Sequence, residues 1–324
     1  MVWNPKLPLG VAVILWAPCL LKKGSFYIIR KQTSGLLCSQ LYIQYNRRII
    51  VNILIDDTNI SFSAQMLGQA IGGVFPALVD ICIVSLDVKE EDVGAVCFAI
   101  ATAVLVICLA SLMWALRTPF FRHYYENEDS LSSSTTSTSP KPSTLTILKL
   151  SWVYLLSIFI TFSVTLTIFP SVAVLIKSET SDSGSDWATK YFTPVSVFLL
   201  FNVGDLFGRG LASWIKMPRR STLGKAIVLI ASLSRILFVP LFLYCNIDSD
   251  KQRTVVFKSD ADFITFMALF AISNGYIGNI CMLHGPKSSP EKELQEAIAL
   301  ILIAGLVVGT GVGSFLSYPV VAAL

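Results

Sequence analysis

The chain has 324 residues, of which 54% are hydrophobic and only 14% charged, and its mean hydropathy is +0.67. A soluble domain carries about a quarter charged residues, so this composition excludes an ordinary water-soluble protein and indicates an integral membrane protein. The net charge of +4 is small and dispersed, which argues against a nucleic-acid partner. The seven cysteines show no C-x-x-C spacing and only two histidines are present, so we expect no metal site.

Residues 1–63 form an atypical N-terminal segment. Its first apolar stretch, 7–21, is short and contains two prolines, which is typical of either a signal-like segment or a poor span. Its second apolar stretch, 41–55, carries Arg47 and Arg48 at its centre, where charges are costly in lipid. We therefore predict no stable pair of transmembrane helices in this segment.

Seven later segments are apolar enough to cross a bilayer, which takes about 20 residues of helix. Lipid offers the backbone no hydrogen bonds and the runs do not alternate, so helices are favoured over a barrel. The predicted fold class is an all-α, polytopic helical bundle, with two helices in 64–118, a disordered cytoplasmic linker rich in Ser and Thr in 119–146, and five helices in 147–324. The seven segments are 64–86, 94–116, 147–176, 191–215, 226–245, 262–283 and 297–318.

The fourth segment holds the sharpest polar signal, in the sequence FNVGDLFGR. Asp205 and Arg209 are four residues apart and share a helical face with Asn202. An ionised residue in the middle of a bilayer costs about 2.5–3.5 kcal/mol even on a lenient scale, so these side chains need partners. They either line a polar cavity that takes a solute or form a structural ion pair between helices.

The chemistry of this pair limits a solute that binds there. The carboxylate accepts hydrogen bonds, the guanidinium donates them, and their charges cancel, which favours a neutral molecule with hydroxyls and ring nitrogens. The sequence shows no carboxylate cluster for cation coupling and no phosphate-binding loop, which favours facilitated diffusion over pumping. It also shows no nucleophile–base constellation, so we expect neither an enzyme nor a cofactor.

Other residues in the spans receive structural interpretations. Arg235 either lines the cavity or hydrogen-bonds helix ends, and the second is favoured. Pro170 predicts a kink near the end of the third segment. Gly73, with Gly68 and Gly72, gives a small face that favours close helix packing.

These motifs, taken in order along the chain, resemble the equilibrative nucleoside transporter family. The most specific are the F-N-x-x-D-x-x-G-R pattern that ends at Arg209 and the SNGY stretch Ser273–Tyr276. The likeness also includes GQAIGGVF, TIFPSV, PVSVFLLFNVGDLFGR, RILFVPLFLYCNI and FITFMALFAISNGYIGNICM.

The resemblance implies a partial major-facilitator-like fold that matches the last seven of the family's eleven helices. It implies facilitated nucleoside transport across the plasma membrane or an endolysosomal membrane. It assigns nucleoside contacts to Asp205 and Arg209, and Gly73 matches a glycine associated with transport and targeting. The further substrate-binding residues that it implies are Asn202, Phe198, Phe169 and, by a looser match, Leu306.

Residues 1–60 do not resemble the family's first four helices, which form most of one half of the cavity. We therefore expect a truncated isoform, a pseudogene-like product or an incomplete gene model, and the sequence leaves open whether this chain transports nucleosides alone. The alternative function is a non-transporting membrane interaction protein that pairs with full-length transporters. The expected partners are nucleosides, the lipid bilayer and other membrane helices.

The loop charges predict the orientation of the chain. Lys and Arg concentrate in cytoplasmic loops, so the linker, which is flanked by Arg117, Arg122, Lys141 and Lys149, should be cytoplasmic. In intact cells, a membrane-impermeant thiol reagent should label a Ser134→Cys variant no more than the parent chain, and label it strongly after lysis. Extra labelling before lysis would contradict this orientation.

Overall fold

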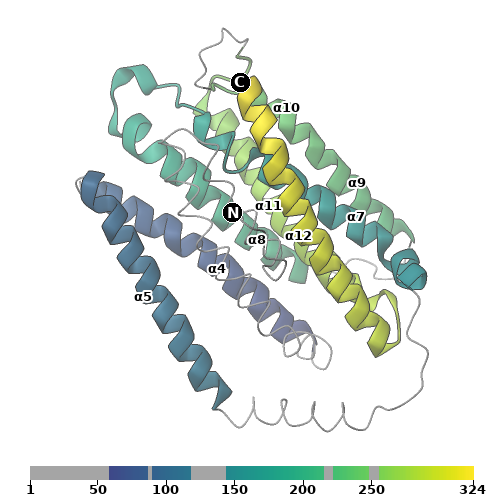
Figure 1. The fold of residues 1–324 in the computed structure, drawn as a ribbon. Helices are drawn as coiled ribbons and strands as arrows, with labels where there is room; N and C mark the ends of the chain where they lie inside the picture. Colours follow the sequence, from purple (N-terminus) through teal and green to yellow (C-terminus); the bar gives the residue numbers. More distant parts are fainter. Residues whose placement is uncertain (1–57, 87–89, 118–143, 215–221, 248–254) are drawn as a thin grey trace, which may run out of the picture.

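The computed structural model describes residues 58–86, 90–117, 144–214, 222–247 and 255–324. The atypical segment up to residue 57 and the linker residues 118–143 lie outside them, so the domain plan stays a prediction. Most of the described residues are helical; turns and short loops join the helices, and two isolated β-bridges pair Ile176 with Ile247 and Cys245 with Phe257. Figure 1 shows a bundle of long helices, which confirms the predicted all-α class.

The long helices follow the predicted apolar segments closely. The helices are α4 (Thr58–Ser85), α5 (Glu90–Leu116), α7 (Thr144–Ile168), α8 (Leu200–Trp214), α9 (Thr222–Ser234), α10 (Phe238–Leu243), α11 (Asp260–His284) and α12 (Lys292–Ala323). Helices α4, α5, α7, α9, α11 and α12 begin two to six residues earlier than hydropathy indicates, whereas α8 begins later.

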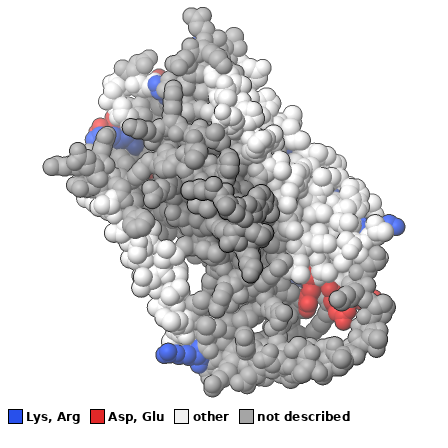
Figure 2. All heavy atoms as spheres, in the orientation of Figure 1, with Lys and Arg blue, Asp and Glu red and all other residues white. Residues whose placement is uncertain are grey.

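Within the described residues, five helical stretches are long and apolar enough to cross a membrane: Thr144–Leu175, Trp187–Ala212, Thr222–Leu243, Asp260–His284 and Glu293–Ala323. Helices α4 and α5 have 28 and 27 residues, and their parts Ile71–Ser85 and Ala99–Ser111 are apolar. In Figure 2 the charged side chains lie toward the ends of the bundle, and the described surface between them carries none. This distribution fits a protein that spans the bilayer.

Prolines explain where the predicted spans depart from regular α-helix. Pro240 has no N–H to donate to the carbonyl of Ile236, and the preceding turn, Arg235–Leu237, is a 3₁₀ helix between α9 and α10. The fourth span begins as π-helix, at Trp187–Tyr191 and at Thr193–Leu199, before α8 starts. The sequence predicts an unbroken helix at both places.

The third span also differs from its prediction. We expect a kink at Pro170, whereas α7 ends at Ile168 and a 3₁₀ turn, Ala173–Leu175, follows the proline. The residue before a proline is disfavoured in helical conformation, so the α-helix stops before Phe169. The Phe169–Pro170 peptide bond is cis.

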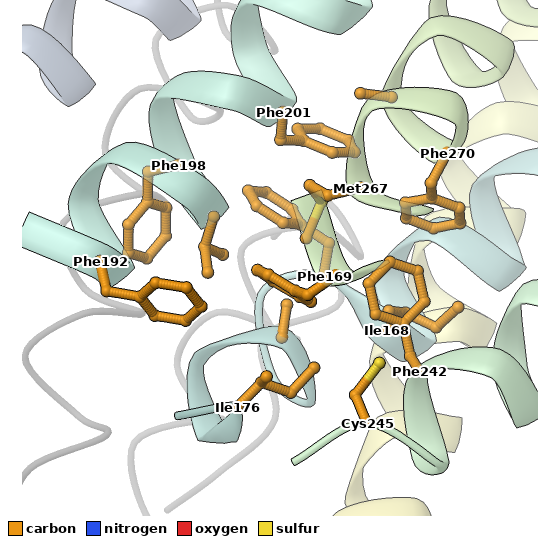
Figure 3. Close-up of a cluster of buried hydrophobic side chains, with 14 of the residues drawn as sticks. Ile168, Phe169, Ile176, Phe192, Phe198, Phe201, Phe242, Cys245, Met267 and Phe270 are labelled. Atoms are coloured by element: carbon orange, nitrogen blue, oxygen red, sulfur yellow. The ribbon is translucent and has the colours of Figure 1, made fainter. Parts of the chain in front are cut away.

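Two apolar clusters fill the bundle, one toward each end of α7. The first is a phenylalanine cluster that contains Phe169, Phe192, Phe198, Phe201, Phe242, Phe263 and Phe270 (Figure 3). The second contains Tyr154, Ile158, Ile280, Ile298 and Leu302. Lipid is as apolar as these side chains, so their contacts stabilise the bundle mainly through dispersion rather than through removal from water.

Helices α7 and α12 run side by side (Figure 1), and glycines bring their backbones together. A Cβ atom on Gly309 would lie 2.8 Å from the carbonyl oxygen of Phe159, and one on Gly313 would overlap the carbonyl oxygen of Ser163. The Ser163 hydroxyl donates a hydrogen bond to the Gly309 carbonyl at 3.1 Å. Small residues spaced four apart allow this close approach of membrane helices.

This close contact predicts different effects for two neighbouring glycines of α12. Gly309→Ala should destabilise the chain by about 1–3 kcal/mol, because overpacking forces the helices apart. Gly311→Ala is the matched control: nothing lies within 4 Å of its Cβ position. The control should be neutral or stabilising by up to about 1 kcal/mol, since alanine favours helix. Thermal unfolding in detergent measures both, and equal melting temperatures would contradict the packing argument.

Candidate functional site

The predicted polar pair forms on α8. The Arg209 Nε donates to the Asp205 Oδ2 at 2.7 Å, one helical turn apart. The Asp205 side chain is 10% exposed and that of Arg209 is 18% exposed, so both are largely withdrawn from the surface. Removal of either partner would leave a buried charge without its main counter-charge, which typically costs about 3–5 kcal/mol.

The second carboxylate oxygen of Asp205 is held from α11. The Asn274 Nδ2 donates to the Asp205 Oδ1 at 2.7 Å, and Asn274 is itself buried. One turn further along α11, the Asn279 Nδ2 donates to the backbone carbonyl of Arg209 at 2.9 Å. Helix α11 therefore fixes the side chain of Asp205 and the backbone of Arg209 together.

Glycines on both helices let the backbones of α8 and α11 approach closely enough for these hydrogen bonds to form. A Cβ atom on Gly275 of α11 would overlap the Asp205 carbonyl oxygen, and one on Gly208 of α8 would overlap the Ile272 carbonyl oxygen. A Cβ atom on Gly204 would lie 2.7 Å from the Cβ atom of Ala271. The backbones of α8 and α11 thus touch directly at the level of the polar pair, which brings short side chains such as asparagine within reach of Asp205.

The predicted residues Asn202 and Gly73 lie against each other. The Asn202 Nδ2 donates to the carbonyl of Phe198 at 2.8 Å, within its own helix. A Cβ atom on Gly73 would overlap the Oδ1 atom of Asn202. Gly73 therefore gives the Asn202 amide its space between α4 and α8.

The predicted residues Phe169 and Phe198 belong to the phenylalanine cluster. Their ring centroids are 5.9 Å apart in an edge-to-face arrangement. Phe169 also stacks on Phe201, with centroids 3.9 Å apart and planes 13° from parallel. In Figure 3, Phe169 lies between Phe198 on one side and Phe242 and Phe270 on the other. Both predicted rings are 7% exposed. Phe198 lies seven residues, about two helical turns, before Asp205, whereas Phe169 comes from the segment that follows α7.

Leu306 lies in a different apolar cluster from Phe169 and Phe198. It packs against the second apolar cluster, which contains Tyr154, Ile158 and Leu302. Its part in binding stays a prediction.

Arg235 is completely buried. Its guanidinium donates to the Phe270 carbonyl at 2.8 Å, to the Thr165 hydroxyl at 2.9 Å and to the Ser273 hydroxyl. Its Cζ atom lies 4.4 Å from the centroid of the Phe270 ring, a cation–π contact. Among the described residues no carboxylate pairs with it directly.

Sequence reasoning missed Asn274 and Thr165 as members of this polar group. Asn274 lies within the quoted SNGY motif, and an amide in an apolar helix needs partners in the same way as a charge does. Thr165 belongs to the series Thr161, Ser163, Thr165 and Thr167, all buried in α7. Four polar residues at alternate positions of an otherwise apolar helix are the sequence signal that points to Thr165.

Comparisons with known proteins identify the family of the chain. The sequence model of the family described as nucleoside transporter matches residues 61–322. Over 292 residues the chain is 33% identical to equilibrative nucleoside transporter 1 of Homo sapiens, covering 81% of this chain and 63% of that protein.

Two further relatives extend the comparison. Equilibrative nucleoside transporter 3 of Rattus norvegicus is 30% identical over 272 residues, covering 78% of this chain and 56% of that protein. Equilibrative nucleoside transporter 2 of Homo sapiens is 36% identical over 173 residues, covering 53% of this chain and 36% of that protein. The chain spans less than two thirds of the length of these relatives. The extent of the match shows that this integral membrane protein belongs to the nucleoside transporter family.

Proposed function

We propose that the chain takes part in facilitated, equilibrative transport of nucleosides across a membrane, with Asp205 and Arg209 as substrate contacts. The names of its relatives support this function, and those relatives are transporters rather than enzymes. The chain covers only part of their length, so the evidence for its own site comes from the chemistry of its residues.

The observation that carries the proposal is the buried, charge-balanced pair of Asp205 and Arg209. A carboxylate has about four lone-pair positions, and Arg209 and Asn274 occupy one on each oxygen. The remaining positions can accept hydrogen bonds from sugar hydroxyls. The guanidinium carries five donors, which suit hydroxyl oxygens and ring nitrogens. A neutral solute with both kinds of group, such as a nucleoside, fits this pair.

Charge balance also favours equilibrative movement. A driving cation binds best at uncompensated negative charge, whereas Arg209 neutralises Asp205 at 2.7 Å. A solute held by this pair therefore needs no accompanying ion to enter a low-dielectric environment.

The alternative function is a non-transporting protein that pairs with full-length transporters. Its support is the face of α8 beside the site, where Val203 is 44% exposed and Phe207 is 57% exposed. Such side chains can contact another membrane helix as well as lipid. Uptake of labelled uridine or adenosine by proteoliposomes that contain only this chain separates the two functions: uptake above empty liposomes supports transport, and its absence rejects transport by the chain alone.

Two substitutions at Arg209 test the site itself. Arg209→Ala should abolish uptake, because it removes the donors and strands the Asp205 carboxylate. Arg209→Lys keeps the charge and the pairing but loses the planar fork. Its affinity for nucleoside should fall about tenfold, which corresponds to about 1.4 kcal/mol. The measurement is the KM for uridine uptake by reconstituted protein.

The amount of folded protein must be measured for each variant, since an unpaired buried charge also impairs folding. Monodisperse elution in detergent and the melting temperature give this control. Unchanged uptake kinetics in Arg209→Lys would mean that the pair is purely structural and that substrate binds elsewhere.

A further inference from the structure

Arg235 and Asp205 are opposite charges buried in the same bundle without direct contact. Asp205 is buried and Arg235 is completely buried. Two polar side chains lie between them. The Arg235 Nη2 donates to the Thr165 Oγ1 at 2.9 Å, the Thr165 Oγ1 lies 2.7 Å from the Asn274 Oδ1, and the Asn274 Nδ2 donates to the Asp205 Oδ1 at 2.7 Å.

The chemistry of the two ends fixes the direction of every bond in this series. A guanidinium can only donate, so the Thr165 oxygen accepts from it and keeps its hydrogen for another acceptor. An ionised carboxylate can only accept, so the Asn274 amide must turn its NH₂ group toward Asp205 and its oxygen toward Thr165. The single hydroxyl hydrogen of Thr165 is shared between that oxygen and the Thr161 carbonyl, each 2.7 Å away.

We propose that Thr165 and Asn274 form a polar relay through which the buried charge of Arg235 orients the Asp205 carboxylate for substrate, which makes both of them positioning residues. The relay connects the 3₁₀ turn Arg235–Leu237 to α8 through α7 and α11. Hydrogen bonds in series polarise one another in a low-dielectric interior, so the loss of a middle member weakens the others. The inference rests on the proposed function insofar as Asp205 contacts the solute.

Thr165 offers the cleanest test because α7 provides a matched control. Thr165→Val keeps the shape of the side chain and removes the hydroxyl. Thr161→Val is the same substitution one turn earlier, at a fully buried threonine whose hydroxyl has no hydrogen-bond partner among the described residues. Thr165→Ser keeps the hydroxyl and should rescue the relay.

The first measurement is a double-mutant cycle on the melting temperature of the purified full chain, which does not depend on transport. Thr165→Val and Asp205→Asn change opposite sides of Asn274. The change in melting temperature of the double variant should differ from the sum of the two single changes by about 2 °C or more, because residues in one hydrogen-bond network are coupled. The cycle of Thr161→Val with Asp205→Asn should be additive. Additivity in the Thr165 cycle would overturn the relay.

The second measurement is uridine uptake by the reconstituted chain. Thr165→Val should raise KM about tenfold while the maximal rate per folded protein stays within about twofold, since it leaves two buried polar groups without a partner. Thr165→Ser and Thr161→Val should keep the KM of the parent. A coupled cycle with an unchanged KM in Thr165→Val would show a structural network only and would overturn the positioning role.

Failure of the proposed function remains distinguishable from failure of the relay. If the parent chain shows no uptake, transport by this chain is rejected, and the thermal cycle alone decides whether the relay exists. If Thr165→Val yields no folded protein, Thr165→Cys and Thr161→Cys replace the valine pair, because a thiol is a weaker hydrogen-bonding group of similar size.

Discussion

The constraint on which this structure depends is that a charge inside a membrane must find its partners within the protein. The charged side chains of Asp205, Arg209 and Arg235 are largely or fully withdrawn from the surface, within helical stretches long and apolar enough to span a bilayer. The bundle meets this need with short side chains on α7 and α11 and with backbone carbonyls, so the polar interior is shared by α7, α8, α11 and the 3₁₀ turn Arg235–Leu237. The apolar clusters fill the space on either side of it.

Backbone proximity makes that sharing possible. Asparagine and threonine reach only a short distance, so α11 must lie almost in contact with α8 before Asn274 can bind Asp205. Gly208 and Gly275 permit this approach, and a side chain on either would meet backbone atoms that cannot move aside. The same device recurs between α7 and α12. The glycines therefore set the short distance between helices that the buried hydrogen bonds require.

The sequence predicts much of this and misses an identifiable part. The long apolar runs predict the helices, because spanning length is a strong physical signal, and the spacing of Asp205 and Arg209 predicts their pairing, because four residues make one turn. Contacts between helices are harder to predict: Asn274 and Thr165 are distant in sequence from Asp205, and no periodicity relates them. Leu306 shows the same difficulty, since a position in the last helix does not determine which cluster it meets. The short 3₁₀ and π segments cannot be predicted from hydropathy, because hydropathy does not distinguish α, 3₁₀ and π helices.

The direct backbone contact between α8 and α11 has a mechanical consequence. Two helices that touch through glycines cannot slide along each other, because a shift of one residue would place a side chain where only hydrogen fits. Small sliding of packed helices is one common way in which proteins change shape, and rotation of rigid units is another. For α8 and α11, only rotation as a rigid unit is compatible with the glycine contacts. Any rearrangement of the bundle must carry α8 and α11 as one body, so that Asp205, Arg209 and Asn274 keep their mutual geometry while the surroundings move.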